Sequence, residues 1–204
     1  MSKLFYIDDF LPEDQFQALR QRIDRRFVRG NGQKLQHGSD SPVRIESHHS
    51  DGNWQEGVDL LGHECKPAIE KIITSLEDHG ARELCNWSVW FQYITNGMSI
   101  PEHRDAALRK SKQQHTYSAI LYCSDWQPGW GGEFYYGDPV WEELDPTKAQ
   151  QGQPVTRLNV KGVIEPLPNR MLVWSRDIWH AVYPVTYDNP GYKRSFLGTG
   201  WSSI

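Results

Sequence analysis

The sequence WSVWFQYITNGMSIPEHRD, residues 87–105, decides the expected fold, because it joins a β-type run to a turn and ends in a His-Arg-Asp triplet. Its first nine residues are rich in aromatic and β-branched side chains, which favour strands. Similar runs separated by Gly, Pro, Asn and Asp continue to the end of the chain: HTYSAILYC, EFYYG, VTRLNV, MLVW, WHAVYPVTY and KRSFLGTGW. Many short strands without intervening helices predict a sandwich or barrel.

Two helices are predicted upstream of these strands. Apolar residues recur at helical spacing over residues 12–29 and 62–79, and a glycine ends each pattern. Residues 30–54 between them are polar and glycine-rich, and we interpret them as mostly loop, a flap beside a site.

The predicted fold class is therefore mainly β with flanking α-helices, a double-stranded β-helix of the cupin-like jelly-roll kind. One domain is expected over residues 1–204, with N-terminal helical support over about 1–85 and a catalytic core over about 86–204.

Composition and charge indicate which binding partners and which cellular compartment to expect. A formal charge of -4 and a pI near 6.1 give no basic footprint, which argues against nucleic acid as a partner. The start of the chain lacks the pattern of a secretion signal, and no apolar run reaches the roughly 20 residues that span a bilayer. Three widely spaced cysteines suggest neither a disulfide framework nor a zinc knuckle. We expect a cytoplasmic protein with no membrane partner; the sequence does not determine the oligomeric state.

The triplet at residues 103–105 carries the chemistry. Residues two apart on extended backbone point the same way, so His103 and Asp105 can bind one metal while Arg104 faces elsewhere. His180, in a later apolar β-type run, is the predicted third ligand. Two imidazoles and a carboxylate on one face of an octahedral ion leave three sites open, as in non-haem Fe(II) oxygenases. Either signal alone is weak, because H-x-D triplets occur in surface turns and a lone histidine is more often a core residue.

A basic pair follows His180 after a turn. A dicarboxylate bound to iron through its keto-acid end needs a cation for its far carboxylate, and Lys193 and Arg194 are the candidates. Arginine suits this task because its planar fork makes two parallel charge-assisted bonds. The alternative is a pair of surface cations at the start of a strand.

From about Trp87 to Trp201 the chain resembles the 2-oxoglutarate/Fe(II) dioxygenases of the prolyl-4-hydroxylase type. More than half of the chain follows the order of that family, which is more specific than any one motif. The matching pieces are YITNG (93–97), HRD (103–105), AILYCSDW (119–126), GGE (131–133), PLPNRMLVW (166–174), HAVYPV (180–185) and KRS (193–195).

The resemblance implies an enzyme with Fe(II), 2-oxoglutarate and O2 as cofactors, and ascorbate as a further one. Iron would be held by His103, Asp105 and His180, and a C–H bond would be hydroxylated with release of succinate and CO2. A basic residue on the strand after His180 would grip 2-oxoglutarate, and Tyr93 would line the same pocket and donate its phenol to the carboxylate.

Two departures from the family affect the co-substrate pocket. The interval from His180 to the basic pair is longer than usual, so the DNPG turn resembles an insertion. Neighbours on a strand point to opposite faces, and we prefer Arg194 to Lys193 because of its fork. Leu121 stands where some prolyl hydroxylases have a tyrosine.

The first substrate expected from the resemblance is a prolyl residue in a peptide or protein, with a free amino acid or another small metabolite as the alternative. An intact Asp105 favours hydroxylation, because related halogenases lack this carboxylate. Nucleobase demethylation is disfavoured, since RSFLGTGW lacks the second arginine of such relatives. Arg104, Trp126, Trp130 and residues 37–57 are candidate neighbours of the pocket.

Two readings from other classes remain. One is a non-catalytic cupin-like or lectin-like jelly roll whose aromatic residues bind a sugar, without succinate formation. The other is a metal-dependent hydrolase that activates water and needs neither O2 nor 2-oxoglutarate. The H-E-x-x-H helix motif of one large hydrolase class is absent from the sequence.

Overall fold

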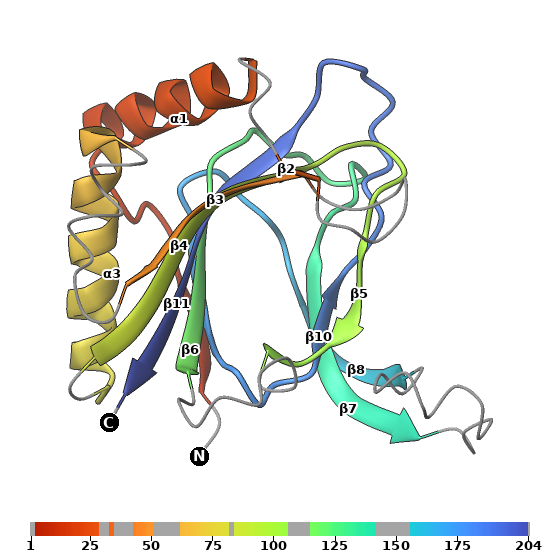
Figure 1. Cartoon of the computed structure of the whole chain (residues 1–204). Helices are drawn as coiled ribbons and strands as arrows, with labels where there is room; N and C mark the ends of the chain where they lie inside the picture. Colours follow the sequence, from red (N-terminus) through yellow and green to blue (C-terminus); the bar gives the residue numbers. More distant parts are fainter. Residues whose placement is uncertain are drawn as a thin grey trace.

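The described residues of the computed structural model form two β-sheets and two main helices (Figure 1). The structure describes residues 3–28, 33–34, 43–50, 62–81, 84–105, 115–141 and 156–203. The helices are α1 (Glu13–Val28), the short 3-10 helix η1 (His63–Cys65) and α3 (Lys66–Asp78). The strands are β1 (Leu4–Ile7), β2 (Gln33–Lys34), β3 (Val43–Ser50), β4 (Leu84–Ile94), β5 (Ile100–His103), β6 (His115–Tyr122), β7 (Phe134–Trp141), β8 (Thr156–Ile164), β9 (Met171–Ser175), β10 (His180–Val182) and β11 (Arg194–Ser203).

The strands form a large and a small antiparallel sheet. The large sheet has the order β1-β9-β6-β11-β4-β3-β2, and the small sheet has the order β5-β10-β7-β8. Figure 1 shows the two sheets facing each other, with α1 and α3 on the outer side of the large sheet. Consecutive strands often lie in different sheets, as in a jelly roll. The predicted fold class is confirmed.

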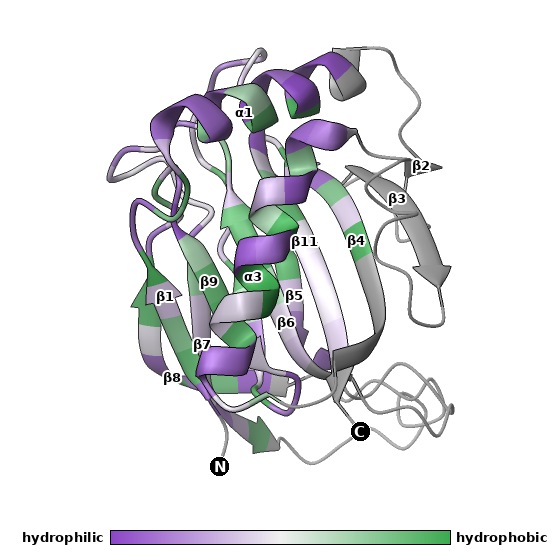
Figure 2. Cartoon of the chain, turned by 90° about the vertical axis from the view of Figure 1, so that its left-hand side faces the viewer, coloured by the Kyte–Doolittle hydropathy of each residue, from purple (hydrophilic) through white to green (hydrophobic). Residues whose placement is uncertain are grey.

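The helices cover one face of the large sheet because each strand alternates its side chains between two faces. On β11, Leu197 and Trp201 are buried on the face that packs against the helices. From α3, Ile69, Ile72 and Leu76 fill the same core. Figure 2 shows α3 lying across the strands of this sheet.

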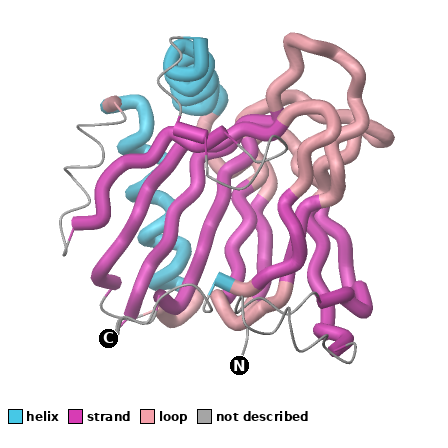
Figure 3. The backbone as a smooth tube through the Cα atoms, turned by 45° about the vertical axis from the view of Figure 1, so that its right-hand side comes forward, coloured by secondary structure: helices cyan, strands magenta, loops and turns pink. Residues whose placement is uncertain are grey.

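A second cluster of apolar residues lies on the other face of the large sheet, between the two sheets. Its buried members are Ile120, Tyr122, Phe134, Ile164, Leu172, Trp174 and Phe196. Four of them are aromatic, which places large rings in the space enclosed by the two sheets. Figure 3 shows that most of the described loops gather at one end of the strands.

Both predicted helices are confirmed, and α1 and α3 begin and end close to the expected residues. The reading of residues 30–54 as mostly loop is wrong over β3, which pairs with β4 and extends the large sheet. The polar sequence of β3 gave no apolar strand pattern. The strand forms nevertheless, because pairing with β4 satisfies its backbone hydrogen-bonding groups whatever the side chains are. The remaining residues of the expected flap at 37–57 lie outside the described part of the chain.

Within the described ranges, none of the helices combines the length and the apolar character needed to cross a membrane.

Candidate metal centre

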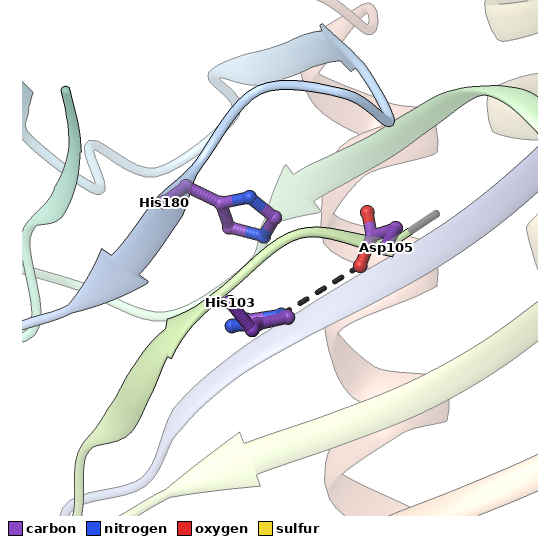
Figure 4. Close-up of side chains that lie close together, drawn as sticks. All are labelled: His103, Asp105 and His180. Carbon is purple, nitrogen blue, oxygen red and sulfur yellow. Dashed lines mark ion pairs between the residues drawn. The ribbon is translucent and has the colours of Figure 1, made fainter. Parts of the chain in front are cut away.

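His103 and His180 are brought together by the small sheet. They end β5 and begin β10, and they are direct partners across these antiparallel strands. Directly opposite residues present their side chains on the same face, and the two imidazole centroids lie 4.3 Å apart. Asp105 follows two residues after His103 and turns its carboxylate toward both rings (Figure 4). One ligand atom from each of the three side chains lies within 4.8 Å of the others.

Backbone carbonyls orient both imidazoles. Nδ1 of His103 lies 2.7 Å from the Pro101 carbonyl oxygen, and Nδ1 of His180 lies 2.9 Å from the Ile178 carbonyl oxygen. A carbonyl oxygen can only accept, so each Nδ1 carries the proton and donates it. In the neutral form of such a ring the lone pair is on Nε2, which is the atom left to bind a metal.

The two carboxylate oxygens of Asp105 have different surroundings. Oδ2 accepts hydrogen bonds from Ser118 Oγ at 2.6 Å and from Trp174 Nε1 at 3.0 Å. Oδ1 instead lies 3.6 Å from His103 Nε2. Ligands bound at about 2.1 Å in neighbouring positions of one ion are about 3 Å apart, so a small rotation brings these two atoms to bonding positions.

The protonation states also suit a metal. Burial lowers the pKa of His180 to about 4, against the opposing effect of Asp105, so this imidazole is neutral near pH 7. Burial acts to raise the pKa of Asp105, but His180, His103 and the Ser118 hydrogen bond together hold it below its ordinary value. A neutral His180 imidazole and an ionised Asp105 carboxylate are the forms that bind Fe(II).

A buried arginine lies on the inner face of the large sheet. Arg194 begins β11 and is 1% exposed, and its guanidinium carbon is 4.9 Å from the centre of the Tyr122 ring and 5.6 Å from that of Phe196. None of its three guanidinium nitrogens has a hydrogen-bond partner among the described residues. Burial lowers the pKa of Arg194, while Tyr122 and Tyr192 act to raise it. A buried cation without a partner costs several kcal/mol, so an anion bound here is strongly favoured.

The same aromatic cluster connects this arginine to the histidines. Tyr122 and Phe196 flank Arg194 and belong to one cluster with Phe134, whose ring stacks on His180 at 5.1 Å. Arg194 and His180 therefore pack against one aromatic cluster between the sheets.

Comparison with known proteins identifies the family. The sequence model described as the 2OG-Fe(II) oxygenase superfamily matches residues 89–202, which is more than half of the chain. The chain belongs to this superfamily. The match includes the three candidate ligands and Arg194, and the family implies Fe(II), 2-oxoglutarate and O2 as cofactors. No curated protein matches the sequence.

Solved oxygenase structures share the fold at low sequence identity. A prolyl-4-hydroxylase from Pseudomonas putida aligns over 100% of this chain and 93% of its own, with 20% identity and a TM-score of 0.62. A Trichoplax adhaerens prolyl hydroxylase, in complex with a hypoxia inducible factor peptide fragment, aligns over 98% and 83%, with 13% identity and a TM-score of 0.63. The α-ketoglutarate-dependent epimerase SnoN of nogalamycin biosynthesis aligns over 99% and 77%, with 10% identity and a TM-score of 0.66.

The structure contradicts the expected place of Tyr93 in this oxygenase. Tyr93 is paired with Ser195, one residue beyond Arg194, and a shift of one residue turns a side chain to the other face. It packs against the helix-side core and not into the space between the sheets. The matched YITNG segment located the strand but not the direction of this ring.

Lys193 also lies apart from the triad. Its ammonium is 5.2 Å from the centre of the Tyr93 ring, and it borders a cavity of about 530 Å³ that is also lined by Arg20 and Asp24 of α1. Of the two cations considered, only Arg194 is buried on the inner face.

Tyr122 is the aromatic residue that sequence matching missed. It faces Arg194, it is fully buried, and its hydroxyl has no hydrogen-bond partner among the described residues. Burial raises its pKa, so the phenol keeps its proton and can donate. The family resemblance aligned Leu121 with a tyrosine of some prolyl hydroxylases. In the structure Leu121 faces the helices, and its neighbour Tyr122 faces the space between the sheets.

The other candidate neighbours have structural contacts. The indole of Trp126 is buried and donates to the Gly131 carbonyl, and Trp130 stacks on Tyr187. Arg104 is exposed and lies 5.6 Å from the Trp179 ring centre.

Proposed function

We propose that this chain is an Fe(II)- and 2-oxoglutarate-dependent dioxygenase that hydroxylates a C–H bond, with a prolyl residue in a peptide or protein as its first substrate class. The observation that carries the proposal is a His-Asp-His ligand triad and a buried arginine that contact the same aromatic cluster, the arginine having no hydrogen-bond partner among the described residues. A metal site alone would serve a hydrolase equally well. The arginine adds a binding group for a second, anionic molecule, as an oxidation driven by 2-oxoglutarate requires.

Each residue has a defined task in this proposal. His103 and His180 present Nε2 to the ion and Asp105 presents Oδ1, and the family's Fe(II), 2-oxoglutarate and O2 would together supply the oxidising chemistry. Arg194 binds the far carboxylate of 2-oxoglutarate through its fork, and the Tyr122 hydroxyl donates to the same group.

The apolar rings of the inter-sheet cluster support the same chemistry by keeping water away from the reacting atoms. Phe134 and Trp174 pack against the His180 ring at centroid distances of 5.1 and 5.0 Å. Excluding water strengthens the electrostatic contacts inside the site and limits side reactions of the oxidant. Ascorbate is expected to sustain turnover by keeping the iron reduced.

The prolyl assignment draws on two of the structural neighbours, which are prolyl hydroxylases. A second candidate is oxidation of a small molecule, because an α-ketoglutarate-dependent epimerase aligns with this chain at a similar TM-score. A non-catalytic sugar-binding jelly roll is less consistent with the site, since it provides no reason for a buried guanidinium that has no hydrogen-bond partner in the described part of the chain.

The experiment is a succinate assay on protein reconstituted with Fe(II), 2-oxoglutarate and O2. Wild type is expected to form succinate, and His103→Ala and Asp105→Ala are expected to abolish it. Arg104→Ala, which changes the exposed residue between the two ligands, is the matched control and should retain activity. Wild-type-like turnover by either ligand variant would remove that residue from the proposal.

Substrate class is tested with a library of proline-containing peptides and a panel of free amino acids, both analysed by mass spectrometry. A gain of one oxygen on a peptide supports the first candidate. Modification of a free amino acid with no peptide modified would replace it with the second.

A further inference from the structure

Asp105 is held by the large sheet, although the two histidines belong to the small one. Ser118 on β6 and Trp174 on β9 are direct partners across these two strands, and both side chains reach the same oxygen, Oδ2. The carboxylate therefore contacts both sheets: Oδ2 bonds to the large sheet, and Oδ1 lies near the His103 imidazole of the small sheet.

The two hydrogen bonds use the acceptor capacity of Oδ2. An ionised carboxylate offers about four lone-pair sites, two on each oxygen. Ser118 and Trp174 occupy two of them on Oδ2, and the 2.6 Å bond from Ser118 has the length of a strong charge-assisted hydrogen bond. Oδ1 is left as the oxygen that faces the imidazoles.

The main chain of Asp105 is fixed as well. Arg176, just beyond the end of β9, donates from Nη2 to the Asp105 carbonyl oxygen at 2.9 Å. Strand β9 and the turn that follows it thus hold both the backbone and the side chain of Asp105. These contacts limit rotation of the carboxylate about the Cβ–Cγ bond.

We propose that Ser118 and Trp174 are positioning residues that restrict Asp105 to binding the metal through Oδ1 alone. This inference rests on the proposed function. An octahedral ion with three single-atom ligands has three free sites, and a 2-oxo acid uses two of them while O2 uses the third. A carboxylate that bound through both oxygens would leave only two free sites. We call the two hydrogen bonds to Oδ2 the Ser118–Trp174 clamp. By holding Oδ2 away from the ion, the clamp leaves three sites free for the keto acid and O2.

The effect of the clamp on Fe(II) and 2-oxoglutarate binding can be measured without turnover. Ser118→Ala removes one donor and little volume, and Trp174→Phe removes one donor together with part of a buried indole ring. Loss of such hydrogen-bond partners typically lowers metal affinity about 10- to 100-fold, and we expect about tenfold for each single variant. In metal-saturated protein, the released Oδ2 competes with the keto acid, so we expect the double variant to bind 2-oxoglutarate at least tenfold more weakly.

The measurements are anaerobic calorimetric titrations of Fe(II) and then of 2-oxoglutarate. The visible charge-transfer absorbance of the chelated keto acid is a second readout, and it should weaken in the variants. Trp126→Phe is the matched control, because it removes a buried indole that donates to the Gly131 carbonyl. Both of its affinities should stay within about twofold of wild type.

The outcomes separate this inference from the proposed function. Wild type that fails to bind Fe(II) would end the proposed function itself. Wild type that binds Fe(II) and 2-oxoglutarate, while the clamp variants bind both as tightly, would refute the clamp alone. Ser118→Ala removes one hydroxyl, so it remains the deciding variant if Trp174→Phe reduces folding.

Discussion

Exchanging Arg194 for Gln separates co-substrate binding from iron binding. The Arg194 side chain is fully enclosed, and its nitrogens have no partner among the described residues, so a bound carboxylate supplies the missing acceptors. Truncating one member of a buried, hydrogen-bonded charge pair costs about 2–5 kcal/mol. At about 1.4 kcal/mol per tenfold, 2-oxoglutarate should bind about 30- to 3,000-fold more weakly, while Fe(II) affinity stays within a few-fold of wild type.

The assay is an anaerobic titration of Fe(II)-loaded protein with 2-oxoglutarate, and Lys193→Gln is the matched control because Lys193 borders the cavity on the helix side. The ligand-free Arg194→Gln protein should be at least as stable as wild type, because a neutral amide is easier to bury than an unpaired cation. Unchanged 2-oxoglutarate affinity in Arg194→Gln, with a loss in Lys193→Gln, would refute this reasoning and transfer the role to the lysine.

Three further predictions address the neighbouring tyrosines, a thiol and an ion pair. Tyr122→Phe should weaken 2-oxoglutarate binding about fivefold, the value of one neutral hydrogen bond of about 1 kcal/mol, whereas Tyr93→Phe should leave it unchanged; the opposite order in the same titration would restore Tyr93 to the pocket. Burial raises the pKa of the Cys123 thiol to about 12, so this thiol should resist iodoacetamide at pH 8 in native protein and react only after denaturation, as read by peptide mass spectrometry. Asp8→Asn should lower the free energy of unfolding near pH 7 by about 1 kcal/mol, because it removes the negative charge paired with the buried Arg170 guanidinium while Asp8 itself is half exposed. Since the hydrogen bond with Arg170 lowers the pKa of Asp8, this contribution is present above pH 3.8 and is lost as the pH falls through the folded-state pKa, so a difference that persists in stronger acid would contradict it.

The parts of this protein that the sequence predicts are those with a local pattern. Alternating apolar side chains predicted strands such as β6 and β11, and helical spacing predicted α1 and α3. His103 ends β5 and Asp105 follows two residues later, and this spacing was the basis for predicting that both side chains point to one metal. The resemblance implied that His180 joins them, whereas the pairing of β5 with β10 that brings it there was not predicted.

The parts that were missed depend on register and on contacts across the sheets. Tyr93 and Tyr122 are both aromatic residues on predicted strands, and a single residue of register decides which one faces Arg194. Ser118 and Trp174 have no local motif, because their role arises only where two neighbouring strands bring their side chains to one oxygen of Asp105. Such convergence leaves no pattern in a single sequence.

The most direct test of the central claim is anomalous diffraction at the iron edge from crystals grown anaerobically with Fe(II). We predict one iron per chain, bound by Nε2 of His103, Nε2 of His180 and Oδ1 of Asp105 at about 2.0–2.2 Å, and no iron at this position in His103→Ala. An iron atom bound elsewhere, or a triad that stays open at saturating Fe(II), would contradict the account.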